Sequence, residues 1–132
     1  MNQVLEKEKV EDLIYEIRGK QVMLDSDLAR LYECVNGTKD INKAVRRNIE
    51  RFPEDFYFQL TDEEYIELRF QFGTTKGRNM SRTLPHVFTE QGIAMLASVL
   101  RTKIASEVSV NIMRAFVIMK KYISSNLIEQ KY

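Results

Sequence analysis

Residues 38–60 combine a run of cations with a separate run of aliphatic side chains, at spacings that a helix would place on two different faces. The outward face consists of Lys43, Arg46, Arg47 and Glu50, and the inward face of Ile41, Val45 and Ile49. Lysine and arginine neutralise phosphate groups, and a short helix with outward cations fits the major groove of DNA. A solvated helix face without a ligand explains this pattern alone equally well.

A turn and a shorter helix are expected immediately before this cationic helix. Asp25 or Ser26 is expected to cap the shorter helix, and Asn36-Gly37 is a turn signal between the two helices. The inner face of the shorter helix is expected to hold Leu28, Leu31 and Tyr32. Helix, tight turn and cationic helix follow the order of a helix-turn-helix unit. A hairpin with Gly19 in its turn is expected upstream, with strands at residues 14–17 and 21–24.

A proline and an alternating strand are expected to follow the cationic helix. Phe52-Pro53 should end that helix, because the residue before a proline is driven out of the helical region. Residues 56–60 then alternate in polarity and predict a half-buried strand. Thr61 and Glu64 form a capping box at the start of another helix. The expected core residues of that helix are Tyr65, Leu68 and Phe72.

The charge along the chain is uneven, although the net charge is only +1. Residues 36–51 hold five bases against two acids, and residues 69–82 hold four bases and no acid. The second segment contains a glycine-rich loop, residues 73–82, that would act as a wing beside the cationic helix. Its cations are Lys76, Arg78 and Arg82. A strand at residues 84–88 follows, and Pro85 favours a sheet edge. Two such segments folded onto one face would form a nucleic-acid footprint.

The last third of the chain predicts a helical hairpin. Thr89 is the expected N-cap of its first helix, and a longer helix should run from Arg101-Thr102 to about Asn126. The expected core positions are Ile93, Leu96, Val99 and Leu100, followed by Ile104, Val108, Ile112, Ala115, Met119 and Ile123. Val110, Met113 and Val117 fall outside that stripe, so the second helix is either buried on two sides or forms a homodimer seam.

Length and composition predict one α+β domain over residues 1–132, with a charged and partly frayed segment at 1–12. The 132 residues suffice for a hydrophobic core, and no stretch is apolar enough to cross a membrane. The charged N-terminus lacks the apolar core of a secretory signal. The single cysteine, Cys34, excludes an internal disulfide and a cysteine-based zinc site. These features predict a cytoplasmic protein.

No set of residues predicts catalysis, a metal or a cofactor. His86 is the only histidine, and a structural, hydrogen-bonded role suits it better than that of a base. Cys34 is expected to be buried and inert. Three consecutive acids, Asp62, Glu63 and Glu64, fit the first turn of a helix better than a nuclease metal site. No glycine-rich phosphate loop is present.

Two long blocks, KAVRRNIERFPEDFYFQL and LPHVFTEQGIAMLASVL, together with VNIMRAF, resemble the KilA-N family. The resemblance extends from about Ile14 to Met119 and includes IRGKQVML and DLARLY. It is closest to the N-terminal domains of phage antirepressor-type and mobile-element proteins. The resemblance implies an α+β domain that binds double-stranded DNA in phage or mobile-element gene regulation. The implied reading residues are Lys39, Asn42, Lys43, Arg46, Arg47 and Arg51.

Two features depart from that family. The turn ECVNGTK is longer than expected, and Asp40 stands where a basic or neutral residue is usual. Such domains are commonly joined to an effector region, so a chain ending at Tyr132 is expected to be a fragment or a stand-alone version. The sequence thus predicts a non-catalytic reader of duplex DNA, with a protein-interaction module acting through the C-terminal helix as the alternative.

Overall fold

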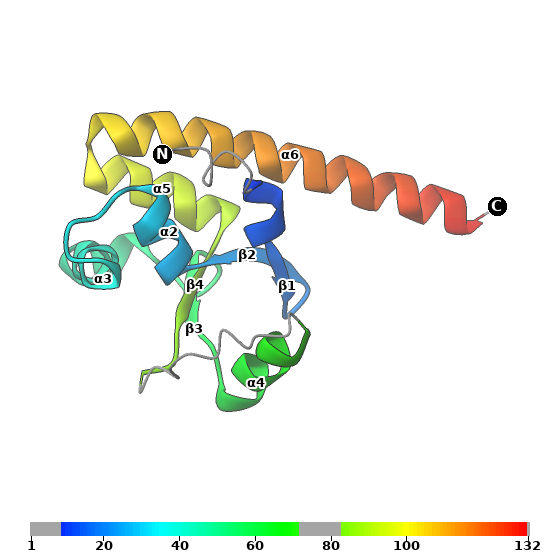
Figure 1. Cartoon of the computed structure of the whole chain (residues 1–132), viewed down its shortest axis with the longest axis horizontal. Coiled ribbons are helices and arrows are strands. Elements are labelled where there is room, and N and C mark those ends of the chain that lie inside the picture. Colours follow the sequence, from blue (N-terminus) through cyan, green and yellow to red (C-terminus); the bar gives the residue numbers. More distant parts are fainter. Residues whose placement is uncertain (1–8, 72–82, 132) are drawn as a thin grey trace.

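Figure 1 shows a small antiparallel sheet with helices on both of its faces. The computed structural model describes residues 9–71 and 83–131, with side chains as far as residue 124. The strands are β1 (Tyr15–Ile17), β2 (Lys20–Leu24), β3 (Tyr57–Gln59) and β4 (His86–Thr89). The α-helices are α2 (Asp25–Leu31), α3 (Thr38–Arg47), α4 (Asp62–Gln71), α5 (Glu90–Leu100) and α6 (Lys103–Lys131), and two short 3-10 helices are η1 (Val10–Leu13) and η2 (Ile49–Arg51). The predicted α+β class is confirmed.

The sheet has the strand order β1-β2-β4-β3, so β4 is a central strand. It pairs with β2 through Met23 and Phe88, and with β3 through Phe58 and Val87. The prediction that Pro85 marks a sheet edge is therefore wrong. Pro85 precedes the first paired residue of β4, so its missing N–H lies outside the ladder. Its carbonyl still accepts a hydrogen bond from the Leu60 backbone N–H at 3.0 Å.

The hairpin and the strand predicted at 56–60 form close to the expected positions. Arg18 and Gly19 both have positive φ, at 59° and 73°, as a two-residue hairpin turn requires. The β3 strand is shorter than predicted and excludes Phe56, whose carbonyl instead accepts the Thr89 backbone N–H at 3.1 Å. Alternation correctly places Phe58 in the interior.

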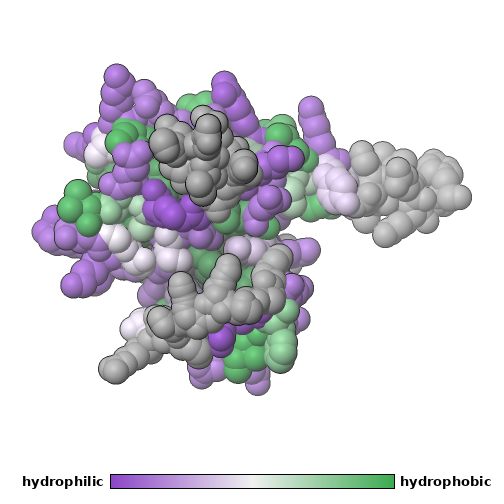
Figure 2. Space-filling view, viewed as in Figure 1, coloured by the Kyte–Doolittle hydropathy of each residue, from purple (hydrophilic) through white to green (hydrophobic). Residues whose placement is uncertain are grey.

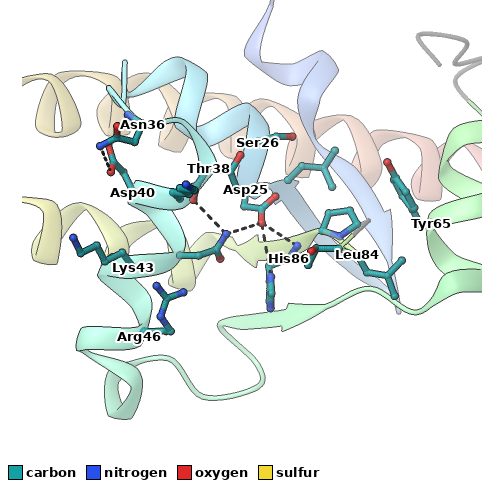
Figure 3. Close-up of a pocket in the computed structure, with 15 residues that line it drawn as sticks. Asp25, Ser26, Asn36, Thr38, Asp40, Lys43, Arg46, Tyr65, Leu84 and His86 are labelled. Carbon is teal, nitrogen blue, oxygen red and sulfur yellow. Dashed lines mark hydrogen bonds and ion pairs between the residues drawn. The ribbon is translucent and has the colours of Figure 1, made fainter. Parts of the chain in front are cut away.

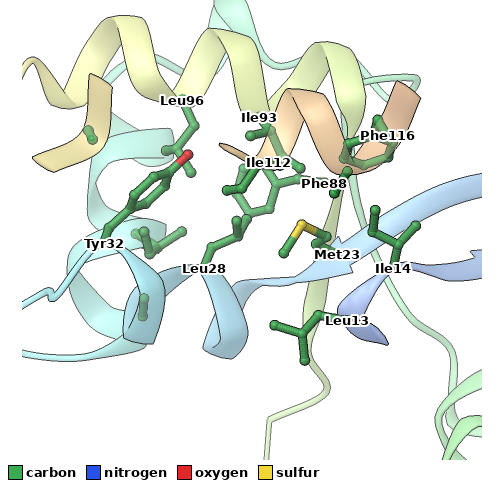
Figure 4. Close-up of a cluster of buried hydrophobic side chains, with 14 of the residues drawn as sticks. Leu13, Ile14, Met23, Leu28, Tyr32, Phe88, Ile93, Leu96, Ile112 and Phe116 are labelled. Atoms are coloured by element: carbon green, nitrogen blue, oxygen red, sulfur yellow. The ribbon is translucent and has the colours of Figure 1, made fainter. Parts of the chain in front are cut away.

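Hydrophobic residues pack on both faces of the sheet. The larger cluster lies between the sheet and helices α2, α3, α5 and α6 (Figure 4). Its fully buried members include Met23, Leu28, Ile41, Val45, Phe88, Ile93, Leu96 and Ile112. A smaller cluster on the opposite face, against α4, consists of Ile17, Val22, Phe58, Leu60, Leu68 and Val87. Neighbours in one strand, such as Val22 and Met23, thus enter different clusters, because successive side chains point to opposite faces.

Helix α3 ends five residues earlier than Phe52-Pro53. Asn48 leaves the helical conformation, and its side-chain Nδ2 donates to the Ala44 carbonyl at 2.9 Å, which satisfies an acceptor at the helix end. The chain then tightens into η2, and the helical spacing is lost. Ile49 is 56 % exposed as a result, so its predicted burial is wrong, whereas Phe52 enters the main cluster.

The start of α4 follows the prediction. Glu64 donates its backbone N–H to Thr61 Oγ1, and the Thr61 N–H donates back to Glu64 Oε1, at 3.1 and 2.9 Å. Arg18 of the hairpin also binds both Glu64 carboxylate oxygens, at 2.8 and 3.1 Å. Leu68 is buried and Tyr65 half-buried, while Phe72 lies outside the described residues.

The C-terminal hairpin forms from α5 and α6, with Thr89 accepting the Gly92 N–H at 3.3 Å as predicted. The buried face of α6 consists of Ala105, Ser109, Ile112, Ala115 and Phe116. Of the predicted stripe, Ile112 and Ala115 are buried and Val108 and Met119 pack against the main cluster, whereas Ile123, at 39 % exposure, is not in the core. Val110 and Val117 are about half exposed, but Met113 packs against the main cluster.

Candidate nucleic-acid interface

Five cations are exposed on α3 and the short helix that follows it. They are Lys39, Lys43, Arg46 and Arg47 on α3 and Arg51 on η2. None of the five forms a salt bridge within residues 9–71 and 83–124. Buried Ile41 and Val45 fix the opposite side of α3 in the main cluster. The predicted orientation of the cationic helix is therefore confirmed, and none of these cations is held in a salt bridge by those neighbours.

Two grooves flank α3. The first has a volume of about 1030 Å³ and is lined by Lys39, Lys43 and Arg46 on the α3 side. The opposite wall includes Thr83–His86, at the start of β4 (Figure 3). The second, about 460 Å³, is lined by Lys43 and Arg47. The cations of α3 are thus distributed over both flanks and do not form one row.

A buried carboxylate, Asp25, connects α3 to the sheet (Figure 3). Its Oδ2 accepts hydrogen bonds from Asn42 Nδ2 at 3.2 Å and from the His86 backbone N–H at 3.1 Å. Tyr57 donates its hydroxyl to Asn42 Oδ1 at 3.0 Å, and its ring stacks on His86 with centroids 4.8 Å apart. These four residues, the Asp25 network, join α2, α3, β3 and β4. Asp25 does not cap α2 as predicted, because its carboxylate is used here and no side chain caps that helix.

Burial determines how the Asp25 network ionises. It raises the pKa of Asp25, although hydrogen bonds from Asn42 and His86 favour the carboxylate. Burial lowers the pKa of His86, although the nearby charge of Asp25 acts to raise it. Asp25 Oδ2 lies 3.8 Å from His86 Nδ1. Burial also raises the pKa of Tyr57 to about 12, with Asp25 adding to the shift, so the phenol remains a donor at neutral pH. His86 has the structural surroundings that its position in the strand predicted.

Asn42 has internal partners for both ends of its amide. Besides the bonds to Asp25 and Tyr57, its Nδ2 donates to the Thr38 carbonyl at 3.3 Å. Asn42 is half-buried, whereas the adjacent Lys43 is exposed. Contact between Asn42 and a base would require exchange of these bonds, so the reading role that the family resemblance implies for Asn42 would carry a free-energy cost that the arginines do not have.

Asp40, one of the two departures from the family pattern, stabilises the turn between α2 and α3. Its carboxylate accepts hydrogen bonds from the Asn36 backbone N–H at 3.0 Å and side-chain amide at 3.2 Å. These bonds lower the pKa of Asp40. The same turn contains Glu33 and Gly37 at positive φ, 56° and 66°. Asp40 therefore stabilises the turn that precedes the cationic helix, which accounts for an acid at this position.

The predicted wing residues Lys76, Arg78 and Arg82 lie outside the described residues. Within the part of the chain that is described, no group of three or more His, Cys, Asp or Glu residues could hold a metal ion. Cys34 is half-buried, not buried as predicted, and burial raises the pKa of its thiol. No helix among the described residues is long and apolar enough to cross a membrane.

The Asp25 network was not predicted from the sequence. Asp25 resembled a cap, Tyr57 the outward residue of a strand and His86 an isolated histidine. No spacing links them, because they come from separate elements that only the tertiary fold brings together.

Comparison with known families gives one match. The model of the ORF6N domain matches residues 12–99, which include both the sheet and α3. No curated protein and no solved structure matches the chain.

Proposed function

Since the chain belongs to the ORF6N-domain family, a phage-associated family of regulatory or antirepressor-like type, we propose that it is a non-catalytic domain that binds duplex DNA. The matching family model is that of the ORF6N domain. Membership of the KilA-N family, which the sequence resembles, is therefore part of this proposal. The proposed setting is gene regulation in a phage or mobile element, in the cytoplasm.

The observation that carries the proposal is the exposed, unneutralised charge of α3. Helices α2 and α3 pack against each other across the turn of residues 32–37, and the second carries the cations, as in helix-turn-helix readers. Arg46 or Arg47 would read guanine through a bidentate contact, because a guanidinium matches two acceptors at once. Lys39, Lys43 and Arg51 would bind phosphates. If all five cations neutralise phosphates and release counterions, log K should fall with log salt at a slope of roughly −4 to −5.

Charge reversal at two positions tests this. The variant with Arg46→Glu and Arg47→Glu should lose retention on a pool of random duplexes at low salt, with an unchanged circular dichroism spectrum. The matched control reverses two exposed cations far along α6, Arg114→Glu and Lys121→Glu, and should retain binding. If the double α3 variant binds as well as the wild-type protein, the α3 cations form only a solvated surface and do not bind DNA.

The exposed face of α6 favours a second candidate, self-association. Val110 and Val117 are 50 % and 48 % exposed, and seven residues of helix separate them, so they lie on the same side. We propose that a homodimer would bury them, with Met113 at its margin. Val110→Ser with Val117→Ser should convert a dimer into a folded monomer in sedimentation experiments. A wild-type protein that is already monomeric at high concentration would rule this candidate out.

A further inference from the structure

The corner between α5 and α6 presents two exposed cations at the same end of the molecule as α3 (Figure 1). Arg101 and Lys103 flank Thr102, and all three residues are exposed. Neither cation has a salt bridge within residues 9–71 and 83–124. The first turn of α6 contains no acid. The corner is therefore a second positively charged surface, separate in sequence from the five cations of α3 and η2.

A shared groove connects this corner to α3. The groove of about 460 Å³ has Lys43 and Arg47 on the α3 side, and Leu100 and Thr102 on the corner side. Two acids also line it. One is Asp40, whose carboxylate is occupied by Asn36, and the other is Glu33. Figure 2 shows mainly hydrophilic side chains at this end of the molecule. Lys43 and Arg47 thus line the groove from α3, and Arg101 and Lys103 are the chain neighbours of Thr102, which lines it from the corner.

The backbone of the corner holds this arrangement in place. Arg101 has φ 55° and ψ 32°, the left-handed conformation in which glycine is the usual residue after a helix. Its N–H donates to the Ala97 carbonyl at 3.2 Å, which closes α5, and Thr102 Oγ1 accepts the Ala105 N–H at 3.0 Å, which opens α6. An arginine therefore occupies a position where a glycine would fold with less strain.

We propose that Arg101 and Lys103 bind backbone phosphates of the same duplex that receives α3, on the flank of α3 that carries Arg47. The inference rests on the proposed function and extends its contact surface. The partner chemistry follows from charge, because a row of phosphates complements both the cations that line the groove on α3 and the two cations beside Thr102. Flexible lysine and arginine side chains at an exposed corner fit the backbone better than base edges, so these contacts should be independent of sequence.

The test compares the salt dependence of duplex binding in matched double variants. Arg101→Gly with Lys103→Gln removes both charges and relieves the left-handed arginine, so the fold should be retained. Arg114→Gln with Lys121→Gln removes two exposed cations about 16 and 27 Å along α6 from the corner. The corner variant should reduce the magnitude of the log K–log salt slope by about 2, equally for different duplex sequences, whereas the control should leave it unchanged. The variant Arg101→Lys with Lys103→Arg keeps both charges and should have the wild-type slope.

The outcomes separate this inference from the function on which it rests. If the wild-type protein binds no duplex at low salt, the proposed function fails. If it binds and the corner variant has the wild-type slope, DNA binding stands and the corner has no part in it. If both variants reduce the slope equally, the effect is one of net charge, and the inference is again overturned.

Discussion

Asn42 shows how a single amide can determine the placement of the cationic helix. It is the link between the buried Asp25 carboxylate and the Tyr57 hydroxyl, so Asn42→Ala would remove the acceptor of the Tyr57 hydroxyl and one of the donors to Asp25, which keeps the His86 N–H. We expect a loss of about 1–3 kcal/mol in the free energy of unfolding, measured by urea denaturation. The neighbouring exposed Lys43→Ala should change it by less than about 0.5 kcal/mol. Equal effects of the two substitutions would mean that the Asp25 network does not stabilise the fold.

His86 gives the chain a pH-dependent stability with a defined sign. Its pKa in the folded chain lies below the ordinary 6.5, so the unfolded chain binds more protons as the pH falls through that range. The free energy of unfolding should therefore decrease between pH 7.5 and 5.5. The pKa of Asp25 is raised above its ordinary value of 3.8, so at pH values above 3.8 this group makes the free energy of unfolding increase as the pH falls. In His86→Phe, which keeps a ring against Tyr57, the decrease in urea-measured stability should be smaller. A wild-type slope in that variant would contradict the prediction.

At the scale of elements, Gly92 allows α5 to approach the turn before β3. A Cβ at this position would lie 1.9 Å from the Phe56 carbonyl oxygen, a backbone atom that cannot move aside easily. Gly92→Ala should therefore destabilise the chain by about 3 kcal/mol or more, seen as a lower midpoint in urea. Gln91→Ala, at the adjacent exposed position, is the control and should have little effect. A stable Gly92→Ala protein would mean that this contact is looser than the structure indicates.

Local patterns predicted some elements well and failed for others for physical reasons. The face of α3, the hairpin and the capping box of α4 follow from spacing and from neighbouring residues, and all three formed as expected. The end of α3 did not, because the Asn48 side chain takes the Ala44 carbonyl before the proline is reached. The central position of β4 depends on which strands pair, and that is decided by contacts far apart in the chain.

At the scale of the whole molecule, the two hydrophobic clusters should unfold together. Single-domain behaviour remains a prediction, and the two faces of one sheet give it a test. Leu96→Ala in the main cluster and Leu68→Ala in the smaller one should each lower the midpoint of the same urea transition. The fully buried Leu96 should cost more, about 2–5 kcal/mol. Separate transitions, followed by circular dichroism and by tyrosine fluorescence, would show that the α4 side unfolds independently.

The candidate interface is also a property of the whole molecule. Sequence identified the cations of α3, because they recur within one short segment. The sequence marks Arg101 only as part of the boundary between two helices, and no pattern singles out Lys103. Thr102, which lies between them, lines the same groove as Arg47 because α5 packs on α3, and no local pattern reports that packing.

The central place of β4 also sets an order of events during translation. β2 and β3 leave the ribosome first, yet they do not pair with each other, since the strand that lies between them is the last of the four to be synthesised. Until it emerges, Asp25 lacks the His86 N–H and Phe58 lacks its pairing partner. A nascent chain therefore carries all the charge of α3 before it has a rigid surface on which to hold it. Under the proposed function, duplex binding should begin only after a later part of the polypeptide has closed the sheet.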